Sequence, residues 1–213
     1  MSPAAKHLGA FIVGSLFASV SANASAAPTA ASAASTPALA ERFPPPRIGA
    51  RFAYVDGVFK LRCNRWVVHD VSASGDITSR CGASSLTVTA DGNPVAALDE
   101  QGDVVARFAP FLPQLSFPLQ VGKKWSGHYD GQEGRFKHWS GDMACEAAAF
   151  EPVRIAAGSF DAFRIECVTQ VRVLFLHQVV KSTNWYAPAA GMIVKSVNDD
   201  SGWDMELAGE DGG

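Results

Sequence analysis

The fold is decided by residues 153–197, which read VRIAAGSFDAFRIECVTQVRVLFLHQVVKSTNWYAPAAGMIVKSV. A turn at residues 156–159 (AAGS) leads into an alternating run at residues 163–167 (FRIEC), and a second β-like run follows at residues 171–175 (VRVLF). The sequence WYAP then interrupts the pattern before another apolar run begins at Gly191. This order of strands and turns is typical of an antiparallel sheet that buries one face.

Short β-like runs also fill the rest of the chain, separated by Asp-Gly, Gly-Asp and Asn-Pro pairs that are common between strands of a barrel or a strongly curved sheet. No window of helical length shows a clean 3.6-residue stripe. Residues 143–150 could form a short helix by propensity, but we expect a strand there. The sequence therefore predicts an all-β fold, a curved antiparallel sheet that forms an open or half β-barrel. Outside the opening stretch, the expected strands are residues 51–55, 58–63, 66–71, 85–90, 104–108, 124–129 and 135–140.

The amino terminus predicts export. Lys6 precedes an apolar run at residues 8–20, and two Ala-x-Ala cleavage candidates follow at residues 22–26. The run is shorter than the about 20 apolar residues that cross a bilayer, so residues 1–26 are interpreted as a Sec-type signal peptide. No cysteine follows the run to carry a lipid. We predict a bacterial protein that is periplasmic or secreted, with no transmembrane anchor after the signal is removed.

Composition divides the remaining chain into three parts. Residues 27–46 are rich in Ala, Ser, Thr and Pro, which predicts a flexible tether. Residues 47–208 are long enough for a single β domain with its own core, and residues 209–213 are expected to be a disordered tail. The net charge of −3, without a basic stripe, argues against nucleic acid as a partner.

Four cysteines in an exported chain favour disulfide bonds. A hairpin turn at residues 72–75 would bring Cys63 close to Cys81, and a turn about residues 157–158 would do the same for Cys145 and Cys167. We therefore predict the pairs Cys63–Cys81 and Cys145–Cys167. Each pair closes a loop of roughly 20 residues, which the chain-entropy model values at about 3 kcal/mol. The alternative, redox-active or metal-binding thiols, lacks a Cys-x-x-Cys pair.

Both predicted pairs are a few residues out of register, so each hairpin needs a β-bulge. The apolar phase changes at residues 64–65 in the first hairpin, and Pro152 interrupts the second. These are the predicted bulge sites.

Three sequence pieces occur in a characteristic order: residues 117–125 (FPLQVGKKW), residues 153–162 (VRIAAGSFDA) and residues 185–194 (WYAPAAGMIV). Together they resemble a widespread group of bacterial envelope proteins in which a PL-x-x-G-x-x-W strand start, an aGtF hairpin and a WyaP-x-x-G-x-V strand pair recur. Proteins of this kind are similar to the open-barrel lipoprotein carriers. The resemblance covers roughly the carboxy-terminal half. It implies a curved sheet around an apolar cavity and an envelope location, and it supplies no catalytic residues.

Residues 108–119 combine apolar side chains with three prolines. Proline removes donors from a β-ladder, so this segment cannot run through the middle of a sheet, yet it is too apolar to remain in water. It should cover an apolar opening, either as a connector that seals the core or as a lid over a ligand cavity. The candidate ligand contacts are Phe108, Phe111, Leu112, Leu115 and Phe117.

A metal site is the best chemical hypothesis in the sequence. His128 and His138 flank residues 130–134, and a hairpin centred there would place the two imidazoles opposite each other, with Asp130 on the face of His128. The alternative is an ordinary solvated loop. We expect no resident cofactor, and a metal only at this site.

The sequence leaves three functions open. The first is a non-enzymatic envelope protein that binds a hydrophobic molecule or an acylated segment in a groove of the sheet. The second is an accessory subunit of an envelope or secretion complex, and the third is a metal-assisted hydrolase using His128, Asp130 and His138. Serine-hydrolase, nucleotide-binding and zincin motifs are absent from the sequence. Trp139 and Trp203, next to Ser, Gly and Asp, could form a carbohydrate or peptide platform, although aromatic residues of this kind are usually part of a sheet core.

Overall fold

The computed structural model describes residues 38–55, 57–61, 63, 65–199 and 203–211. They belong to one compact unit that spans residues 36–213. The predicted signal peptide, residues 1–26, lies outside the described residues. No helix in the described part of the chain is long and apolar enough to span a membrane.

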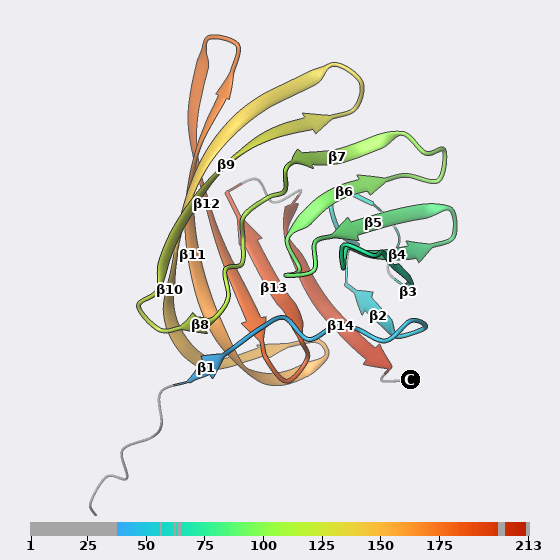
Figure 1. Cartoon of the computed structure of the whole chain (residues 1–213), viewed down its shortest axis with the longest axis vertical. Helices are drawn as coiled ribbons and strands as arrows, with labels where there is room; N and C mark the ends of the chain where they lie inside the picture. Colours follow the sequence, from blue (N-terminus) through green and yellow to red (C-terminus); the bar gives the residue numbers. More distant parts are fainter. Residues whose placement is uncertain (1–37, 56, 62, 64, 200–202, 212–213) are drawn as a thin grey trace, which may run out of the picture. The chain divides into compact units, whose positions relative to one another are not determined.

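The described chain is almost entirely β-strand, and twelve of its strands close into an antiparallel barrel (Figure 1). The barrel order is β10-β11-β12-β13-β14-β2-β3-β4-β5-β6-β7-β9, and β1 pairs separately with β8. The strand bounds are β1 Leu39–Ala40, β2 Arg51–Tyr54, β3 Arg65–Val71, β4 Ile77–Cys81, β5 Ser84–Val88, β6 Pro94–Leu98, β7 Val104–Ala109, β8 Leu119–Gln120, β9 Lys124–Glu133, β10 Lys137–Ile155, β11 Gly158–Val173, β12 Leu176–Ala187, β13 Met192–Asn198 and β14 Met205–Asp211.

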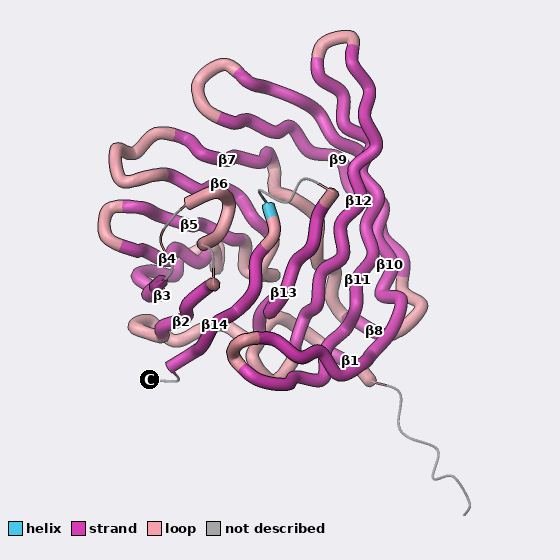
Figure 2. Tube along the Cα trace, turned by 180° about the vertical axis from the view of Figure 1, so that it is seen from behind, coloured by secondary structure: helices cyan, strands magenta, loops and turns pink. Residues whose placement is uncertain are grey.

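The prediction of an all-β, curved antiparallel sheet is confirmed, and residues 143–150 form part of strand β10. The sheet is closed rather than open. The barrel closes through two pairings between strands that are not consecutive in the chain. These are β14 with β2 and β7 with β9. Long strands form one side of the barrel and short strands the other (Figure 2).

Both predicted disulfides are present. Cys145 and Cys167 lie directly opposite each other in the β10–β11 ladder. The bulges that permit this register lie elsewhere than predicted. In β10 the register shifts between Ala147 and Ala149, not at Pro152, because Pro152 fits the ladder opposite Asp161.

The first hairpin differs in the same way. In β3 the register shifts between Val68 and Asp70, not at residues 64–65. The expected strand at residues 58–63 is also wrong: Val58 and Leu61 form an isolated bridge around a tight turn. Phe59 and Lys60 occupy the turn with φ of 51° and 62°, a backbone conformation that leaves no extended strand.

The domain begins earlier and ends later than the sequence indicated. Residues 38–46, assigned to the tether, already pack on the barrel: Leu39 pairs with Gln120, Ala40 is buried, and the Phe43 ring contacts Phe117. At the other end, residues 209–211 belong to β14 and pair with β2. The composition of residues 38–46 and 209–211 predicts disorder, because it does not show which side chains and backbone groups pair with the barrel.

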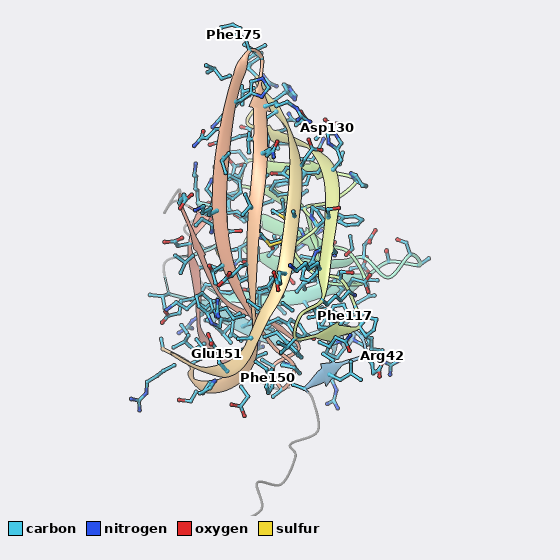
Figure 3. All side chains as sticks on the ribbon, turned by 90° about the vertical axis from the view of Figure 1, so that its left-hand side faces the viewer. Arg42, Phe117, Asp130, Phe150, Glu151 and Phe175 are labelled. Carbon is cyan, nitrogen blue, oxygen red and sulfur yellow. A yellow bond between two sulfur atoms is a disulfide. The ribbon has the colours of Figure 1, made fainter. Side chains whose placement is uncertain are left out.

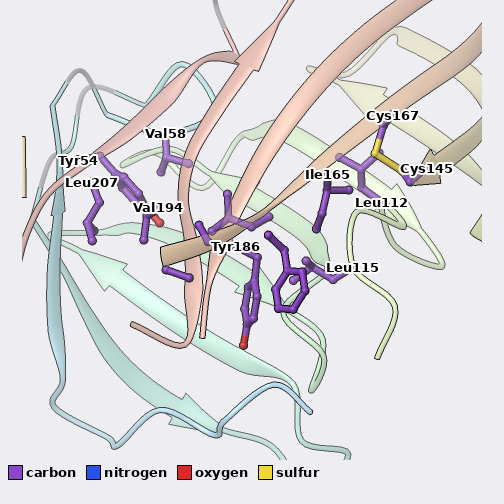
Figure 4. Packing of buried hydrophobic residues seen from close by; sticks show 14 of the residues in the cluster. Tyr54, Val58, Leu112, Leu115, Cys145, Ile165, Cys167, Tyr186, Val194 and Leu207 are labelled. Carbon is purple, nitrogen blue, oxygen red and sulfur yellow. A yellow bond between two sulfur atoms is a disulfide. The ribbon is translucent and has the colours of Figure 1, made fainter. Parts of the chain in front are cut away.

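The buried core lies inside the barrel and is centred on large side chains from opposite walls (Figure 4). The largest fully buried residues include Trp66 from β3, Phe163 and Ile165 from β11, and Tyr186 from β12. Alternation along each strand explains this selection, because every second side chain faces inward. The same alternation shapes the cavities that remain between them.

Candidate ligand-binding site

The interior of the barrel contains a cavity of about 520 Å³, which we call the apolar chamber. Inward-facing side chains of the short strands form one wall, including Val68, Ile77, Leu86 and Val88. Aromatic and sulfur-containing side chains add to this lining: Phe52, Tyr54, Phe59, Met192 and Met205. The polar and charged side chains in the lining include Arg47, Arg51, Ser79 and Gln114. A cavity of this size and composition can hold a small apolar molecule.

Residues 43–46 (FPPP), which we call the strap, line one end of the apolar chamber. Two turn glycines allow the strap to approach the barrel. A Cβ at Gly92 would lie 2.3 Å from Cε2 of Phe43, and a Cβ at Gly191 would lie 2.5 Å from Cγ of Pro44. Both glycines also have positive φ, +77° and +66°, so any side chain at these positions would be strained as well as crowded. The strap is therefore fitted closely to two turns of the barrel.

Tyr54 is the buried ionisable group of the apolar chamber. Burial raises its pKa well above the ordinary value for tyrosine. Tyrosine is already neutral at physiological pH, and burial extends this neutral form to more alkaline pH.

A second cavity of about 220 Å³, the polar chamber, lies among the long strands. One wall is aromatic. Phe108 is at its centre, with ring centroids 5.7 Å from Tyr129, 6.5 Å from Trp139 and 6.2 Å from Trp203. Phe59 joins the same cluster 5.4 Å from Trp203. These distances are typical of edge-to-face and tilted aromatic packing.

Strands β11, β12 and β13 supply a polar wall to the same chamber. It is made of uncharged side chains: Thr169, Ser182, Asn184, Ser196 and Asn198. Asn184 lies opposite Ser196 in the β12–β13 ladder, and Ser182 lies opposite Asn198. The Asn198 amide nitrogen donates to the carbonyl of Trp203 over 2.9 Å and to Oγ of Ser196 over 3.2 Å. Asn184 is fully buried, and neither of its amide atoms has a hydrogen-bond partner among the described residues.

The two chambers share part of their lining. Val58, Phe59, Gln114 and Met205 line both cavities. The two chambers are therefore adjacent, and these four residues lie at the boundary between them.

Charged side chains line the polar chamber near the β9–β10 turn. Nζ of Lys137 lies 2.6 Å from Oε2 of Glu133, and Nζ of Lys60 lies 3.2 Å from Oε1. The hydrogen bond from Lys137 is the main reason that the pKa of Glu133 is below its ordinary value, and partial burial opposes this shift. The carboxylate is therefore paired with lysines on both oxygens.

The structure places the predicted ligand contacts at different depths. Phe108 and Leu112 line the polar chamber, whereas Phe111 lines neither chamber. Leu115 and Phe117 belong to the packed core, where the Phe117 ring lies 5.4 Å from that of Tyr186.

The segment that carries these residues runs from β7 to β8, and hydrogen bonds hold it to the β5–β6 turn and to β9. The Asn93 side chain donates to the carbonyl of Leu115 over 3.1 Å and accepts from its N–H over 2.8 Å. On the other side, Nε1 of Trp125 donates to the carbonyl of Pro113 over 3.0 Å. The segment is thus held as a connector on both sides, and ligand contact by its side chains stays a prediction.

The polar wall was not found by sequence reasoning. The sequence does contain a sign of it. Ser182 and Asn184 are two residues apart, and Asn184 is two residues before Tyr186, so all three alternate positions of β12 are buried. The signal has meaning only once the register shows that this face points inward.

The predicted metal site is wrong in its geometry. The turn of the hairpin lies at residues 134–136, so His138 is opposite Gln132, and His128 is opposite Asp142. Nδ1 of His128 lies 2.7 Å from Oδ1 of Asp142, and Arg172 donates to Oδ2 of the same carboxylate. Oδ1 of Asp130 lies 3.9 Å from Nε2 of His128. Hydrogen bonds from His128 and then Arg172 lower the pKa of Asp142.

This cluster lies on the exposed outer face of the long strands, and His138 is not part of it. Among the described residues, no group of three or more His, Cys, Asp or Glu side chains could hold a metal ion. The two predicted histidines are not brought together.

Comparisons with known proteins do not identify a family for this chain. No protein-family model matches the chain, and no curated protein is significantly similar in sequence. A presumed exported protein with a YmcC-like fold from Bacteroides fragilis is 15% identical, with a TM-score of 0.45 over 80% of this chain and 99% of that chain. A presumed lipoprotein from Parabacteroides distasonis is 14% identical, with a TM-score of 0.43 over 81% and 99%. Such scores carry no argument about activity, so the site itself must support the function.

Proposed function

We propose that this protein is a non-enzymatic, exported binding protein that holds an apolar ligand in the apolar chamber. The observation that carries the proposal is a cavity of about 520 Å³ in a closed barrel, lined mainly by aliphatic and aromatic side chains. Transfer of one methylene from water into such a cavity contributes about 0.8 kcal/mol. An alkyl chain is therefore a suitable occupant even after the entropy cost of association.

The residues around the apolar chamber also favour binding over catalysis. Among the described residues, its ionisable side chains are Arg47, Arg51 and Tyr54. Tyr54 is neutral near pH 7 and burial makes it still harder to ionise, and neither arginine can serve as a general base near neutral pH. This set can orient a ligand but contains no pairing of a nucleophile with a base.

The proposal is tested with N-phenyl-1-naphthylamine, an uncharged probe that fluoresces in apolar surroundings. Wild-type protein should bind it, and Val88→Trp, which fills the apolar chamber, should lower the affinity at least about tenfold. Thr87→Trp is the matched control, because Thr87 is the neighbouring residue on the same strand and does not line the chamber. Absence of probe binding to the wild type, or equal binding by both variants, would contradict the proposal.

A second candidate function, contact with an envelope protein partner, is favoured by the tip of the β11–β12 hairpin. Leu174 and Phe175 form its two-residue turn and are 91% and 83% exposed. Phe175 lies at the far end of the long hairpin (Figure 3). Phe136 in the β9–β10 turn is 91% exposed as well. Exposed aromatic side chains on protruding turns are common at interaction sites.

This candidate is tested by placing a photo-reactive phenylalanine analogue at position 175 and irradiating intact cells. A cross-linked species of defined mass is expected from position 175. The same analogue at Val121, an exposed position outside the long hairpins, is the control. Recovery of only the uncross-linked monomer from both positions would contradict contact with an envelope protein partner.

A further inference from the structure

Asn184 has an unusual environment for a buried amide. It is fully buried in the wall of the polar chamber, and its amide oxygen and nitrogen both lack a hydrogen-bond partner among the described residues. Nearly all buried polar side chains in folded proteins are paired, because an unpaired amide loses its bonds to water without replacement. A ligand with both donor and acceptor groups would supply the missing bonds.

The neighbours of Asn184 extend this polar surface. Ser196 lies directly across the β12–β13 ladder, and Ser182 precedes Asn184 on the same face of β12. Their hydroxyl groups can each donate and accept. A ligand group at this wall therefore meets several adjacent hydroxyl and amide groups, and none of them carries a charge.

The opposite wall of the polar chamber is aromatic, with Phe108, Tyr129 and Trp139 packed against one another. Aromatic faces provide rigid apolar contact for the C–H surface of a ring, while hydroxyl groups at the ring edge need polar partners. The polar chamber offers both surfaces. Its volume of about 220 Å³ is suited to one hydroxylated ring.

A charged head group fits this chamber poorly. Among the described residues that line it, the ionised groups are Glu133 and Lys137, and they pair with each other over 2.6 Å near the β9–β10 turn. A ligand carboxylate or ammonium would be transferred from water to a site with no free opposite charge, which is unfavourable.

We propose that the polar chamber binds the uncharged, hydroxyl-bearing ring of an alkyl or acyl glycoside whose chain extends into the apolar chamber. Val58, Phe59, Gln114 and Met205 line both cavities, so the chambers are adjacent and a ligand that spans this boundary occupies both. Asn184 recognises the ring hydroxyls and so determines specificity. This inference rests on the proposed function, because it assigns the apolar chamber to the chain of the same ligand.

The experiment compares three amphiphiles with the same eight-carbon chain, n-octyl β-D-glucoside, octanoate and octyltrimethylammonium, each below its micelle concentration. Displacement of N-phenyl-1-naphthylamine gives their affinities for the full chain. The wild type should bind the glucoside at least about tenfold more tightly than the two charged compounds. Asn184→Leu should reduce glucoside affinity about tenfold and leave the other two unchanged.

Two controls keep the result interpretable. Ser84→Ala removes a buried hydroxyl that lines neither chamber and should leave the preference for the glucoside intact. Near-ultraviolet circular dichroism establishes that Asn184→Leu is folded. If it is not, nuclear magnetic resonance of the wild type replaces it: the side-chain amide signals of Asn184 should shift with the glucoside and not with octanoate.

The outcomes separate the two proposals. Equal affinity for the three amphiphiles, or an unchanged preference in Asn184→Leu, would overturn the assignment of the polar chamber while probe binding continues to support the apolar chamber. Amide signals of Asn184 that respond equally to glucoside and octanoate would overturn it too. Failure of the wild type to bind the probe at all would overturn the proposed function instead.

Discussion

Two buried asparagines show how the surroundings of one residue decide its contribution to stability. Asn93 makes two hydrogen bonds to the backbone of Leu115, whereas Asn184 makes none within the described residues. We expect Asn184→Leu to raise the free energy of unfolding by about 1–2 kcal/mol, because it removes an unpaired amide from the interior. Asn93→Leu, the matched control, should lower it by about 2–3 kcal/mol by leaving two backbone groups unpaired. Urea denaturation measures both, and a loss of stability in Asn184→Leu would contradict the expectation.

Glu133 predicts a specific dependence of stability on pH. Its pKa is lower in the folded chain than in the unfolded chain, so its contribution is present above the unfolded value and is lost as pH falls through the folded value. Glu133→Gln should therefore be less stable than wild type at pH 7, by up to about 1 kcal/mol for this partly exposed cluster. The difference should shrink as the pH falls below the ordinary pKa of glutamate and disappear once the carboxyl is protonated in the folded chain. Urea denaturation at several pH values checks this, and Glu146→Gln, which affects the more exposed Lys124 pair, should show a smaller difference.

At the scale of elements, the β10–β11 hairpin shows what the sequence could predict and what it could not. Turn composition at residues 156–159 identified both strands, and the positions of Cys145 and Cys167 indicated their pairing. The bulge between Ala147 and Ala149 has no local signal, because three consecutive alanines fit either face of a strand. The inward position of Asn184 depends on register in the same way, which is why the polar wall could be recognised only in three dimensions.

The disulfide in this hairpin should stabilise it measurably. It closes a loop with a sequence separation of 22 residues, so replacing Cys145 and Cys167 together by Ala should cost about 3 kcal/mol of unfolding free energy. Guanidinium denaturation of the double variant provides the value. The double variant should keep its probe affinity, because neither cysteine lines a chamber. Lost probe binding in a folded variant would be inconsistent with this arrangement.

At the scale of the whole molecule, the strap is the part of the amino-terminal segment that lines the apolar chamber and can control access to it. Phe43 contacts Phe117 and Tyr186 with centroid distances of 6.3 and 6.2 Å, so its ring secures the strap to the core. We expect Phe43→Ala to speed probe dissociation severalfold, since the strap covers one end of the chamber less firmly. Stopped-flow fluorescence measures the rate. Leu39→Ala, which removes an exposed side chain from β1, should leave it unchanged, and equal rates for all three proteins would exclude control by the strap.

The pairing of β2 with β14 has a consequence for the timing of folding. These strands lie near opposite ends of the described chain, so the barrel cannot close until the last strand is available. Contacts between such distant residues carry a large loop-closure entropy and generally form slowly. Until then the nascent sheet has two unpaired edges, which can associate with other chains. Closure of this barrel is therefore expected to be a late step of folding, with the partly closed sheet as the aggregation-prone species along the pathway.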